Sequence, residues 1–573
     1  MFSFLEQGWK IDTCLRSLVQ RAGQPEQIVQ NNCSSLCLIP SLLSCFPGSQ
    51  SLAQNERPTC ASPPTPSSYV RPPAHSPPSE VPLLHWPLTQ APHDTTPIDS
   101  TMAPGEANTA TAGAPARRRR VLLFPLPYQG HINPMFQLAG LLHARGFAVT
   151  VFHARFNAPD PSRHPAYGFV PVPDGLPAGT PETVAATMEH ILAVNTSCEA
   201  PFRERLAALL AAPGARDEVA CLVADAHLLA LVRVARRLGV PTLVLRTGSA
   251  ACFRNFLANP VLCEKGYLPV GAESQLDAPV RELPPYRVRD LMGANSRSRH
   301  EHELMCELLS RAVEAVRSSA GFVLNTFDAL EADDLAATRR DLAGVPVFDV
   351  GPLHKLSPAS SSSLLQQDRS CLHWLDAQAP ASVLYISFGS LASMSGEDLA
   401  EAAWGVANSG QPFLWALRPG LARGAALPDG FAAATGGRGL VVGWAPQEEV
   451  LAHGAVGGFW THGGWNSAME GACGGVPMLC RPCFGDQMGN ARHVEHVWRA
   501  GIALDGGVLE RGAVEAAVRR LMRGEEGEGM RGRARELRSR AAAAVADGGS
   551  SRLCVDKLVN HILWLYKPVG LRT

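Results

Sequence analysis

The sequence lacks an excess of charge of either sign and lacks a long apolar run. Its 573 residues carry 51 Lys and Arg against 52 Asp and Glu, a formal net charge of -1. A nucleic-acid-binding protein normally shows a basic excess, so we expect no nucleic-acid partner. No segment reaches the roughly 18 apolar residues that a membrane-spanning helix needs, and no basic stretch precedes an apolar one at the start, as in a signal peptide. We therefore expect a cytoplasmic protein without a membrane span.

Paired cysteine motifs are also scarce, although the chain has 15 cysteines. Cys480 and Cys483 are closely spaced, but no second pair completes a zinc site and Pro482 lies between them. A chain of this length needs no disulfides to fold, so we expect free thiols. The motif His300–His302 predicts no metal site, because adjacent ligands in a polar helix rarely converge on one ion. We expect no bound metal.

The head of the chain has an unusual composition. Residues 58–104 hold 13 prolines in 47 positions, with many Ser and Thr. Such a stretch cannot bury enough apolar surface to fold. We interpret residues 1–116 as a disordered extension, or as an upstream region that is absent from the working protein, in which case Met102 is an alternative start. The alternative interpretation is a Pro-rich segment that binds a recognition domain. Arg117–Arg120 then form a solvated flank, with a localisation or phosphate patch as the alternative.

After Arg120, short apolar strands alternate with amphipathic helices. Residues 121–127 form a continuous apolar run, typical of a strand buried on both faces of a parallel sheet. A tight loop at Gly130–Pro134, a helix ending near Gly146 and a second strand at 147–153 follow. The same alternation returns further on, as in Val219–Asp225, so the sequence predicts an α/β protein built from doubly wound parallel sheets.

The serine-rich segment 357–363 separates two sets of these units. We expect domains with the following limits: an N-terminal Rossmann-like domain at 117–355, a linker at 356–381, a C-terminal Rossmann-like domain at 382–550, and a helix within 551–573 that packs back on the N-terminal domain. Two doubly wound domains that face each other leave a cleft between the carboxyl ends of their strands.

The segment 444–487 carries the clearest site pattern. A strand runs into His462 and Gly463-Gly464, and a helix begins near Asn466 and Ser467. Glycines let the backbone approach a ligand, and a helix N-terminus offers free N–H groups to an anion. The sequence therefore predicts a diphosphate site with these three polar side chains as further donors.

Other side chains of this segment suit the rest of a nucleotide sugar. Trp444 offers a flat face to a base, and Gln447 can hydrogen-bond the base. Glu470 can accept from a ribose diol, while Asp486 and Gln487 suit sugar hydroxyls. The alternative is a glycine-rich turn beside core tryptophans, which explains each residue singly but not the set in this order.

In the first domain, two residues predict acid–base chemistry. His131 follows the first strand and Asp225 ends another apolar strand, so both side chains can meet at one sheet edge. A neutral imidazole can take a proton from a hydroxyl, and a carboxylate on its other nitrogen fixes the tautomer.

The segment Trp444–Gln487 resembles the signature box of plant UDP-glycosyltransferases, which glycosylate small hydrophobic metabolites. The marked positions of the box all match: Trp444, Gln447, His462, Trp465, Asn466, Ser467, Glu470, Asp486 and Gln487. Gly463 stands where Cys is common, and Ala468 where Thr is common. The resemblance covers about residues 120–565 and implies two facing Rossmann-like domains, the GT-B architecture.

The resemblance implies a role for each matched residue. By this resemblance Trp444 stacks on uracil, Gln447 holds the base or ribose, and Glu470 binds the ribose. The diphosphate is contacted by His462, Asn466, Ser467 and Ser390. The sugar is held by Trp465, Asp486 and Gln487, and a Gln at the end of the box is associated with glucose. Ser390 has a helix N-cap as its alternative reading. His131 and Asp225 are implied as the catalytic pair, and Thr247 as a contact to the sugar or its phosphate.

The implied reaction is an inverting, metal-independent transfer of glucose from UDP-glucose to a hydroxyl of a small metabolite, by a monomer. Stretches such as 156–165 and 247–258 look closest to the benzoxazinoid glucosyltransferases of grasses. Cytokinins, flavonoids, terpenoids and phenols are alternative acceptors, and a catalytically idle nucleotide-sugar-binding protein is the alternative function. Arg246 either meets an acidic or polar acceptor or pairs at the surface. A nicotinamide-dependent enzyme is excluded, because the first turn, residues 125–134, lacks GxGxxG.

Overall fold

The computed structural model describes residues 119–566, apart from positions 178, 180, 182, 358–362, 423 and 505–506. All of these residues belong to one compact unit, Asn108–Thr573. The interpretation of residues 1–116 as a disordered extension, with Met102 as an alternative start, lies outside the described residues, and so does most of the serine-rich segment. Within the described part, no helix is both long enough and apolar enough to cross a membrane.

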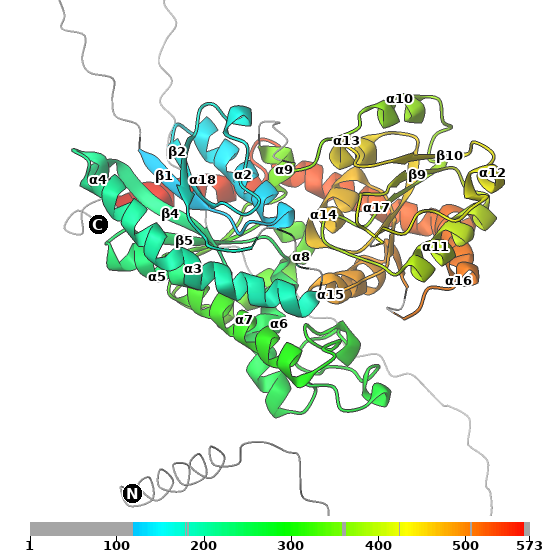
Figure 1. The fold of residues 1–573 in the computed structure, drawn as a ribbon, viewed down its shortest axis with the longest axis horizontal. Helices are drawn as coiled ribbons and strands as arrows, with labels where there is room; N and C mark the ends of the chain where they lie inside the picture. The colour runs from blue at the N-terminus through cyan, green and yellow to red at the C-terminus, as the bar shows by residue number, and fades with distance from the viewer. Residues whose placement is uncertain are drawn as a thin grey trace, which may run out of the picture. The chain divides into compact units, whose positions relative to one another are not determined.

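The first half of the described chain forms a seven-stranded sheet (Figure 1) with the strand order β3-β2-β1-β4-β5-β6-β7. All neighbouring strands are parallel. The strands are β1 (Arg120–Phe124), β2 (Ala148–Ala154), β3 (Gly168–Val172), β4 (Val219–Asp225), β5 (Thr242–Arg246), β6 (Phe322–Leu324) and β7 (Val347–Asp349). The helices are α2 (Gln129–Ala144), α3 (Val184–Ala211), α4 (Ala215–Glu218), α5 (Leu229–Arg237), α6 (Ala250–Glu264), α7 (Arg299–Arg317), α8 (Asp328–Asp341) and α9 (Leu353–Leu356), with 3-10 turns η1 (Pro161–Arg163), η2 (Glu273–Gln275) and η3 (Val288–Asp290).

The second half forms a six-stranded parallel sheet with the order β10-β9-β8-β11-β12-β13. Its strands are β8 (Val383–Ser387), β9 (Phe413–Ala416), β10 (Gly439–Val442), β11 (Val456–Thr461), β12 (Met478–Cys480) and β13 (Gly501–Ala503). Its helices are α10 (Ser370–Asp376), α11 (Gly396–Ser409), α12 (Phe431–Thr435), α13 (Gln447–Ala452), α14 (Trp465–Gly474), α15 (Gln487–Arg492), the π-turn η4 (His493–Val497), α16 (Arg511–Met522) and α17 (Gly524–Val545). The predicted α/β class with two doubly wound parallel sheets is confirmed.

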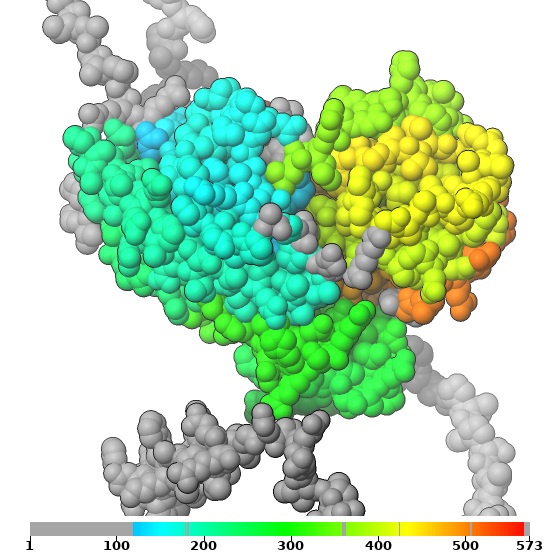
Figure 2. Space-filling model, in the orientation of Figure 1, coloured from blue at the N-terminus to red at the C-terminus, as the bar shows by residue number. Residues whose placement is uncertain are grey.

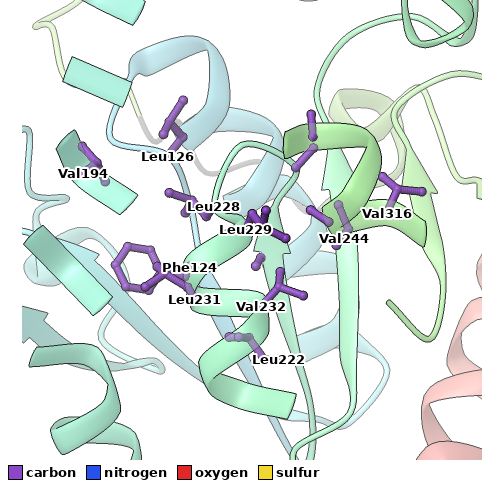
Figure 3. Packing of buried hydrophobic residues seen from close by; sticks show 14 of the residues in the cluster. Phe124, Leu126, Val194, Leu222, Leu228, Leu229, Leu231, Val232, Val244 and Val316 are labelled. Carbon is purple, nitrogen blue, oxygen red and sulfur yellow. The ribbon is translucent and has the colours of Figure 1, made fainter. Parts of the chain in front are cut away.

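The strands read as continuous apolar runs because each sheet is covered on both faces. In β1, Leu122 and Phe124 belong to one core cluster, and Val121 and Leu123 belong to another. Alternate residues of a strand point to opposite faces, so these two clusters are the two faces of the first sheet. Figure 3 shows the first cluster, in which strand residues such as Leu222 pack with residues of α5.

The last helix, α18 (Ser550–Tyr566), returns to the first sheet. Its buried residues, among them Val555, Leu558 and Ile562, join the cluster that contains Val121. The hydroxyl of Ser551 donates a 2.6 Å hydrogen bond to the Gly351 carbonyl, which ties the start of this helix to the end of the first half.

The strand orders determine where a ligand can bind. In the first sheet β2 and β3 lie on one side of β1, and β4 and the later strands lie on the other side. The strand order therefore reverses between β1 and β4, which is the switch point of the sheet. In the second sheet the order reverses in the same way between β8 and β11. Doubly wound sheets bind ligands in the crevice beyond the carboxyl ends of such strands. His131 follows β1 and Asp225 ends β4, while Ser390 and His462 follow β8 and β11.

The predicted loop at Gly130–Pro134 is wrong. Helix α2 begins at Gln129, so His131 lies in its first turn and Pro134 lies inside the helix. Proline has no N–H to donate to the carbonyl four residues earlier, and that carbonyl belongs to Gly130. It accepts a 2.8 Å hydrogen bond from Nδ2 of Asn466 in the second half instead. The proline therefore leaves an acceptor free that joins the two halves.

Candidate active site

A cleft of about 570 Å³ is lined by residues of both halves. In Figure 2 the atoms of the first half, blue to green, adjoin those of the second, yellow-green to orange. Sites for small molecules have volumes of this order. Apart from Asp225, every residue predicted for the site lines this cleft: His131, Thr247, Ser390, Trp444, Gln447, His462, Trp465, Asn466, Ser467, Glu470, Asp486 and Gln487.

Asp225 lies directly behind His131. Nδ1 of His131 is 2.7 Å from Oδ2 of Asp225, and the side chains are 21% and 1% exposed. The imidazole thus stands between a buried carboxylate and the cleft. Because Nδ1 faces the carboxylate, Nε2 is the nitrogen left to accept a proton.

The surroundings of Asp225 keep it ionised. Its Oδ1 accepts a 3.0 Å hydrogen bond from the backbone N–H of His227. Burial alone raises the pKa of Asp225, but the charge and hydrogen bond of His131, together with His227, outweigh burial and hold the pKa below its usual value. Thr247 adds a second polar contact to the imidazole, with Oγ1 3.2 Å from Nδ1 of His131.

On the opposite wall, the ring of His462 fits between two glycines. A Cβ on Gly389 would lie 2.6 Å from Cε1 of His462, and a Cβ on Gly464 would lie 2.5 Å from Nε2. Neither position has room for a side chain. Desolvation and then the charge of Arg418 lower the pKa of His462 to about 4. His462 is therefore a neutral hydrogen-bonding group at pH 7 rather than a cation.

Helix α14 starts at the cleft with no side chain capping its N-terminus. The first N–H groups of a helix need partners from outside the helix and favour an anion. The indole N–H of Trp465 is already used, since it donates a 2.8 Å hydrogen bond to the Asn325 carbonyl of the first half. Trp465 thus offers the cleft its backbone N–H rather than its ring N–H.

Gln447 bonds two of the other predicted residues, Ser467 and Glu470, and also Tyr385. Its Nε2 donates to Oγ of Ser467 at 2.9 Å and to Oε2 of Glu470 at 2.6 Å, and its Oε1 accepts from the Tyr385 hydroxyl at 3.2 Å. Desolvation and the neighbouring charge of Glu448 raise the pKa of Glu470 to about 8. The carboxyl group therefore holds a proton at pH 7.

Gln487 is held in one orientation. Its Oε1 accepts from the backbone N–H groups of Cys483 at 2.8 Å and Phe484 at 3.1 Å. An amide oxygen only accepts hydrogen bonds, so Nε2 is the group left to donate to a ligand. Asp486 immediately precedes α15 beside it and lines the same part of the cleft.

Three residues that matter here were not singled out from the sequence. Arg418 holds the loop that carries Ser390, since Nε donates to the Gly389 carbonyl at 2.9 Å and Nη2 donates to the Ala392 carbonyl. His227 and Tyr385 hold Asp225 and Gln447, respectively. His227 stands two positions after the strand-end Asp225, which was the available signal; nothing in the local sequence marks Arg418 or Tyr385.

The dismissed metal motifs also have clear positions. Cys480 and Cys483 are free thiols, like the other described cysteines. His300 and His302 point to different neighbours, because His300 Nε2 is 2.9 Å from Glu189 and His302 Nε2 is 3.5 Å from Sγ of Cys306. Cys263 lies beside His302 as well, with its pKa raised to about 11 by burial and by Cys306, so it stays a neutral thiol.

Comparison with known proteins identifies the relatives of this chain. Residues 121–530 match the family model described as UDP-glucoronosyl and UDP-glucosyl transferase. The chain is 51% identical over 453 residues to the DIMBOA UDP-glucosyltransferase BX8 of Zea mays, which spans 76% of this chain and 96% of the relative. It is 50% identical over 440 residues to the DIMBOA UDP-glucosyltransferase BX9 of Zea mays, spanning 75% of this chain and 92% of the relative.

Solved structures show the same fold. A UDP-glucosyltransferase from Polygonum tinctorium that glucosylates indoxyl, in a complex with 3,4-dichloroaniline, matches with a TM-score of 0.67 and 28% identity over 78% of this chain and all of that chain. UGT2 of Phytolacca americana, in complex with UDP-2-fluoro-glucose and pterostilbene, matches with a TM-score of 0.66 and 28% identity over 78% of this chain and 99% of that chain.

Proposed function

Because this chain belongs to the UDP-glucuronosyl and UDP-glucosyl transferase family, we propose that it transfers glucose from UDP-glucose to a hydroxyl of a small plant metabolite. Its fold is the GT-B architecture of that family. The observation that carries the proposal is the pair of His131 and Asp225 at one wall of a cleft whose other wall is an uncapped helix N-terminus.

His131 is the general base. Its Nε2 takes the proton of the acceptor hydroxyl while the oxygen attacks the anomeric carbon of the glucose. Asp225 positions the ring through Nδ1 and stabilises the imidazolium that forms. The depressed pKa of Asp225 supports this role, since the carboxylate stays charged over the working pH range.

The diphosphate side uses protein donors. The N-terminus of α14, the side chains of Ser390, Asn466 and Ser467, and the neutral His462 donate to the diphosphate oxygens. As the bond between the anomeric carbon and the diphosphate oxygen breaks, UDP leaves with the electron pair. Hydrogen bonds from these groups offset the charge that develops, so the proposal needs no metal ion.

The remaining donor contacts follow from the chemistry of each side chain. Trp444 stacks on the base, with Gln447 at the base or ribose, and Glu470 accepts from the ribose hydroxyls. Backbone and side-chain groups of Trp465, Asp486 and Gln487, together with Thr247, hold the glucose or its phosphate. A single displacement inverts the anomeric carbon, so the product from UDP-α-glucose is a β-glucoside.

For the acceptor we propose a benzoxazinoid-type hydroxamic acid, supported by the names of the two maize relatives. Cytokinins, flavonoids, terpenoids and phenols are the competing acceptor classes. We further propose a monomer that works in the cytoplasm. A catalytically idle sugar-nucleotide binder is disfavoured, because such a protein has no use for an imidazole backed by a buried carboxylate.

The test is a mass-spectrometric screen of the full chain with UDP-glucose and a panel of cyclic hydroxamic acids, cytokinins, flavonols and simple phenols. We expect a hexose adduct on the hydroxamic acids. His131→Ala should abolish the adduct while UDP still binds, and His373→Ala, at a side chain 96% exposed, should not. Turnover by His131→Ala would refute the assignment of the base.

A further inference from the structure

Arg246 ends strand β5 and lines the cleft near His131. The residue is only 5% exposed. Among the described residues, no carboxylate oxygen lies within 4 Å of its guanidinium, whereas Arg481, the other buried arginine of that part of the chain, has Asp398 at 3.1 Å. Of the two readings given for Arg246, the surface pair is therefore wrong, and among the described residues Arg246 is a buried cation without an ion-pair partner.

Its polar neighbours do not supply a negative charge. Nη1 is 3.0 Å from Nε2 of His227, and Nη2 is 3.5 Å from Sγ of Cys252. Desolvation and the Arg246 charge lower the pKa of His227 to about 3, so this imidazole is neutral. Burial raises the pKa of Cys252 to about 12, so the thiol is neutral too.

Two nearby carboxylates, Asp225 and Glu331, have other partners. Asp225 binds His131 and the N–H of His227. Glu331 accepts from the backbone N–H groups of Ala250 and Ala251 and from the hydroxyl of Thr326. A guanidinium remains charged at any physiological pH, and a buried charge is costly unless an ion of opposite sign joins it. Asp486 lines the same cleft and its charge acts on Cys252, but it makes no ion pair with Arg246. The cleft is therefore the side from which a counter-ion can approach the guanidinium.

The guanidinium is also held rigidly. Its carbon lies 4.5 Å from the ring centroid of Phe256, so the plane is packed on an aromatic face. A Cβ on Gly248 would lie 2.8 Å from Nη2, so the glycine is what leaves room for the group. Of its five N–H donors, the described contacts engage two, and Nε has no partner.

This cation lies close to the proposed base. The rings of His227 and His131 are 5.9 Å apart between centroids, and Thr247, the next residue after Arg246, contacts His131. The cleft that Arg246 lines also has apolar side chains, including Phe256, Met292, Met305 and Leu309. One small molecule can therefore place an acidic group at Arg246 and a hydroxyl at His131.

We infer that Arg246 is an anion-binding subsite for the acceptor, so that the preferred acceptors are flat, apolar weak organic acids with the acidic group one ring away from the hydroxyl that receives glucose. The inference rests on the proposed function and narrows its acceptor class. Carboxylates and ionised hydroxamates present the same chemistry to a guanidinium.

The experiment compares two acceptors of similar shape, the anion 4-hydroxyphenylacetate and the neutral 4-hydroxyphenylacetamide, with saturating UDP-glucose. A cyclic hydroxamic acid and the corresponding lactam without the N–OH group form a second pair. The enzymes are the full chain, Arg246→Gln, Arg246→Lys and the control Arg236→Gln, which alters an exposed arginine of α5. UDP binding and the melting temperature check that each variant is folded.

We expect the full chain to favour the acid over the amide, and Arg246→Gln to reduce that preference about 10- to 100-fold, the range for a hydrogen bond to a charged group. The loss in Arg246→Gln should appear as a higher KM for the acid. Arg246→Lys should recover part of the preference for the acid, and Arg236→Gln should show the same preference as the full chain. If Arg246→Gln reduces the preference more in the acid and amide pair, the subsite favours a carboxylate. If it reduces the preference more in the hydroxamic acid and lactam pair, the subsite favours a hydroxamate.

Two results would overturn the inference: no preference for the acid in the full chain, or an equal loss on acid and amide in Arg246→Gln, as a structural role predicts. Calorimetric binding of the same two compounds in the presence of UDP measures the preference for the acid without turnover. If no acceptor is glucosylated, the proposed function fails, while tighter binding of the acid that depends on Arg246 still supports the subsite.

Discussion

Replacing Gly389 by alanine should damage the donor side of the cleft through one side chain, His462. The new methyl group would lie 2.6 Å from Cε1 and 2.8 Å from Nε2 of that ring. The ring would have to retreat by roughly 1 Å to reach an ordinary contact distance of about 3.5 Å. Gly464 packs against the same Cε1–Nε2 edge of the ring, so the retreat moves His462 out of its position in the cleft.

A misplacement of this size at a reacting centre costs on the order of 100-fold. We therefore expect kcat/KM for UDP-glucose to fall about 100-fold in Gly389→Ala, with a weaker affinity for UDP by calorimetry. Gly389 also has φ +66°, a conformation that costs alanine roughly 1–2 kcal/mol, so backbone strain alone is a second source of any loss.

Two glycines separate these causes. Gly430 has φ +81° with no atom within 4 Å of an added Cβ, so Gly430→Ala carries the strain without the clash. Gly454 has neither a positive φ nor an atom within 4 Å of an added Cβ, so Gly454→Ala is the control without strain or clash. The rate of UDP release, measured at increasing UDP-glucose concentrations, gives kcat/KM for each of the three variants. If Gly389→Ala retains the kinetics of Gly430→Ala, the position of His462 does not control donor use and the reasoning is refuted.

Three other changes have defined outcomes. Asp225→Asn should lower kcat by about 10²–10⁴-fold with little change in UDP affinity, because the ring loses its orienting charge; unchanged kcat would remove Asp225 from the mechanism. The pKa of Glu470, raised to about 8 by burial and Glu448, means that the folded state holds a proton that the unfolded state releases near its usual pKa; stability from this group is therefore present at low pH and lost as the pH rises through about 8. The gain in melting temperature of Glu470→Gln over the parent should accordingly grow between pH 5 and pH 9, and a constant difference would contradict the raised pKa. Trp465→Phe should cost about 1–2 kcal/mol of unfolding free energy in denaturant titrations, since it leaves the Asn325 carbonyl without its donor; a neutral result would mean that water replaces the indole N–H.

The regular elements could largely be predicted from sequence, because buried parallel strands are continuous apolar runs. Strand β4 coincides with the predicted run Val219–Asp225. Strand β3 could not be recognised, because only one of its residues is buried and its sequence is not a continuous apolar run. The start of α2 was missed because Pro134 suggests a loop, and only the tertiary partner of the Gly130 carbonyl accounts for a proline inside that helix.

The site residues likewise fall into those that the sequence could predict and those that it could not. The residues of the donor segment were found because glycines, a strand end and a helix start stand together in sequence. The meeting of His131 with Asp225 could be predicted because both stand at the ends of apolar strands, whose carboxyl ends share an edge in a parallel sheet; that β1 and β4 are neighbours is seen only in the structure. The burial of Arg246 and the support from Arg418 could not be found, because each depends on contacts between distant segments. The catalytic and binding roles of all these residues stay predictions.

The central claim is a single displacement in which His131 deprotonates the acceptor. The most direct measurement is the anomeric configuration of the product, read by proton NMR from the coupling between the first two sugar protons, as UDP-α-glucose is consumed. The account predicts the large coupling of a β-glucoside from the first product onward, and no product with His131→Ala. The small coupling of an α-glucoside would mean a double displacement or another attacking group, and would contradict the account.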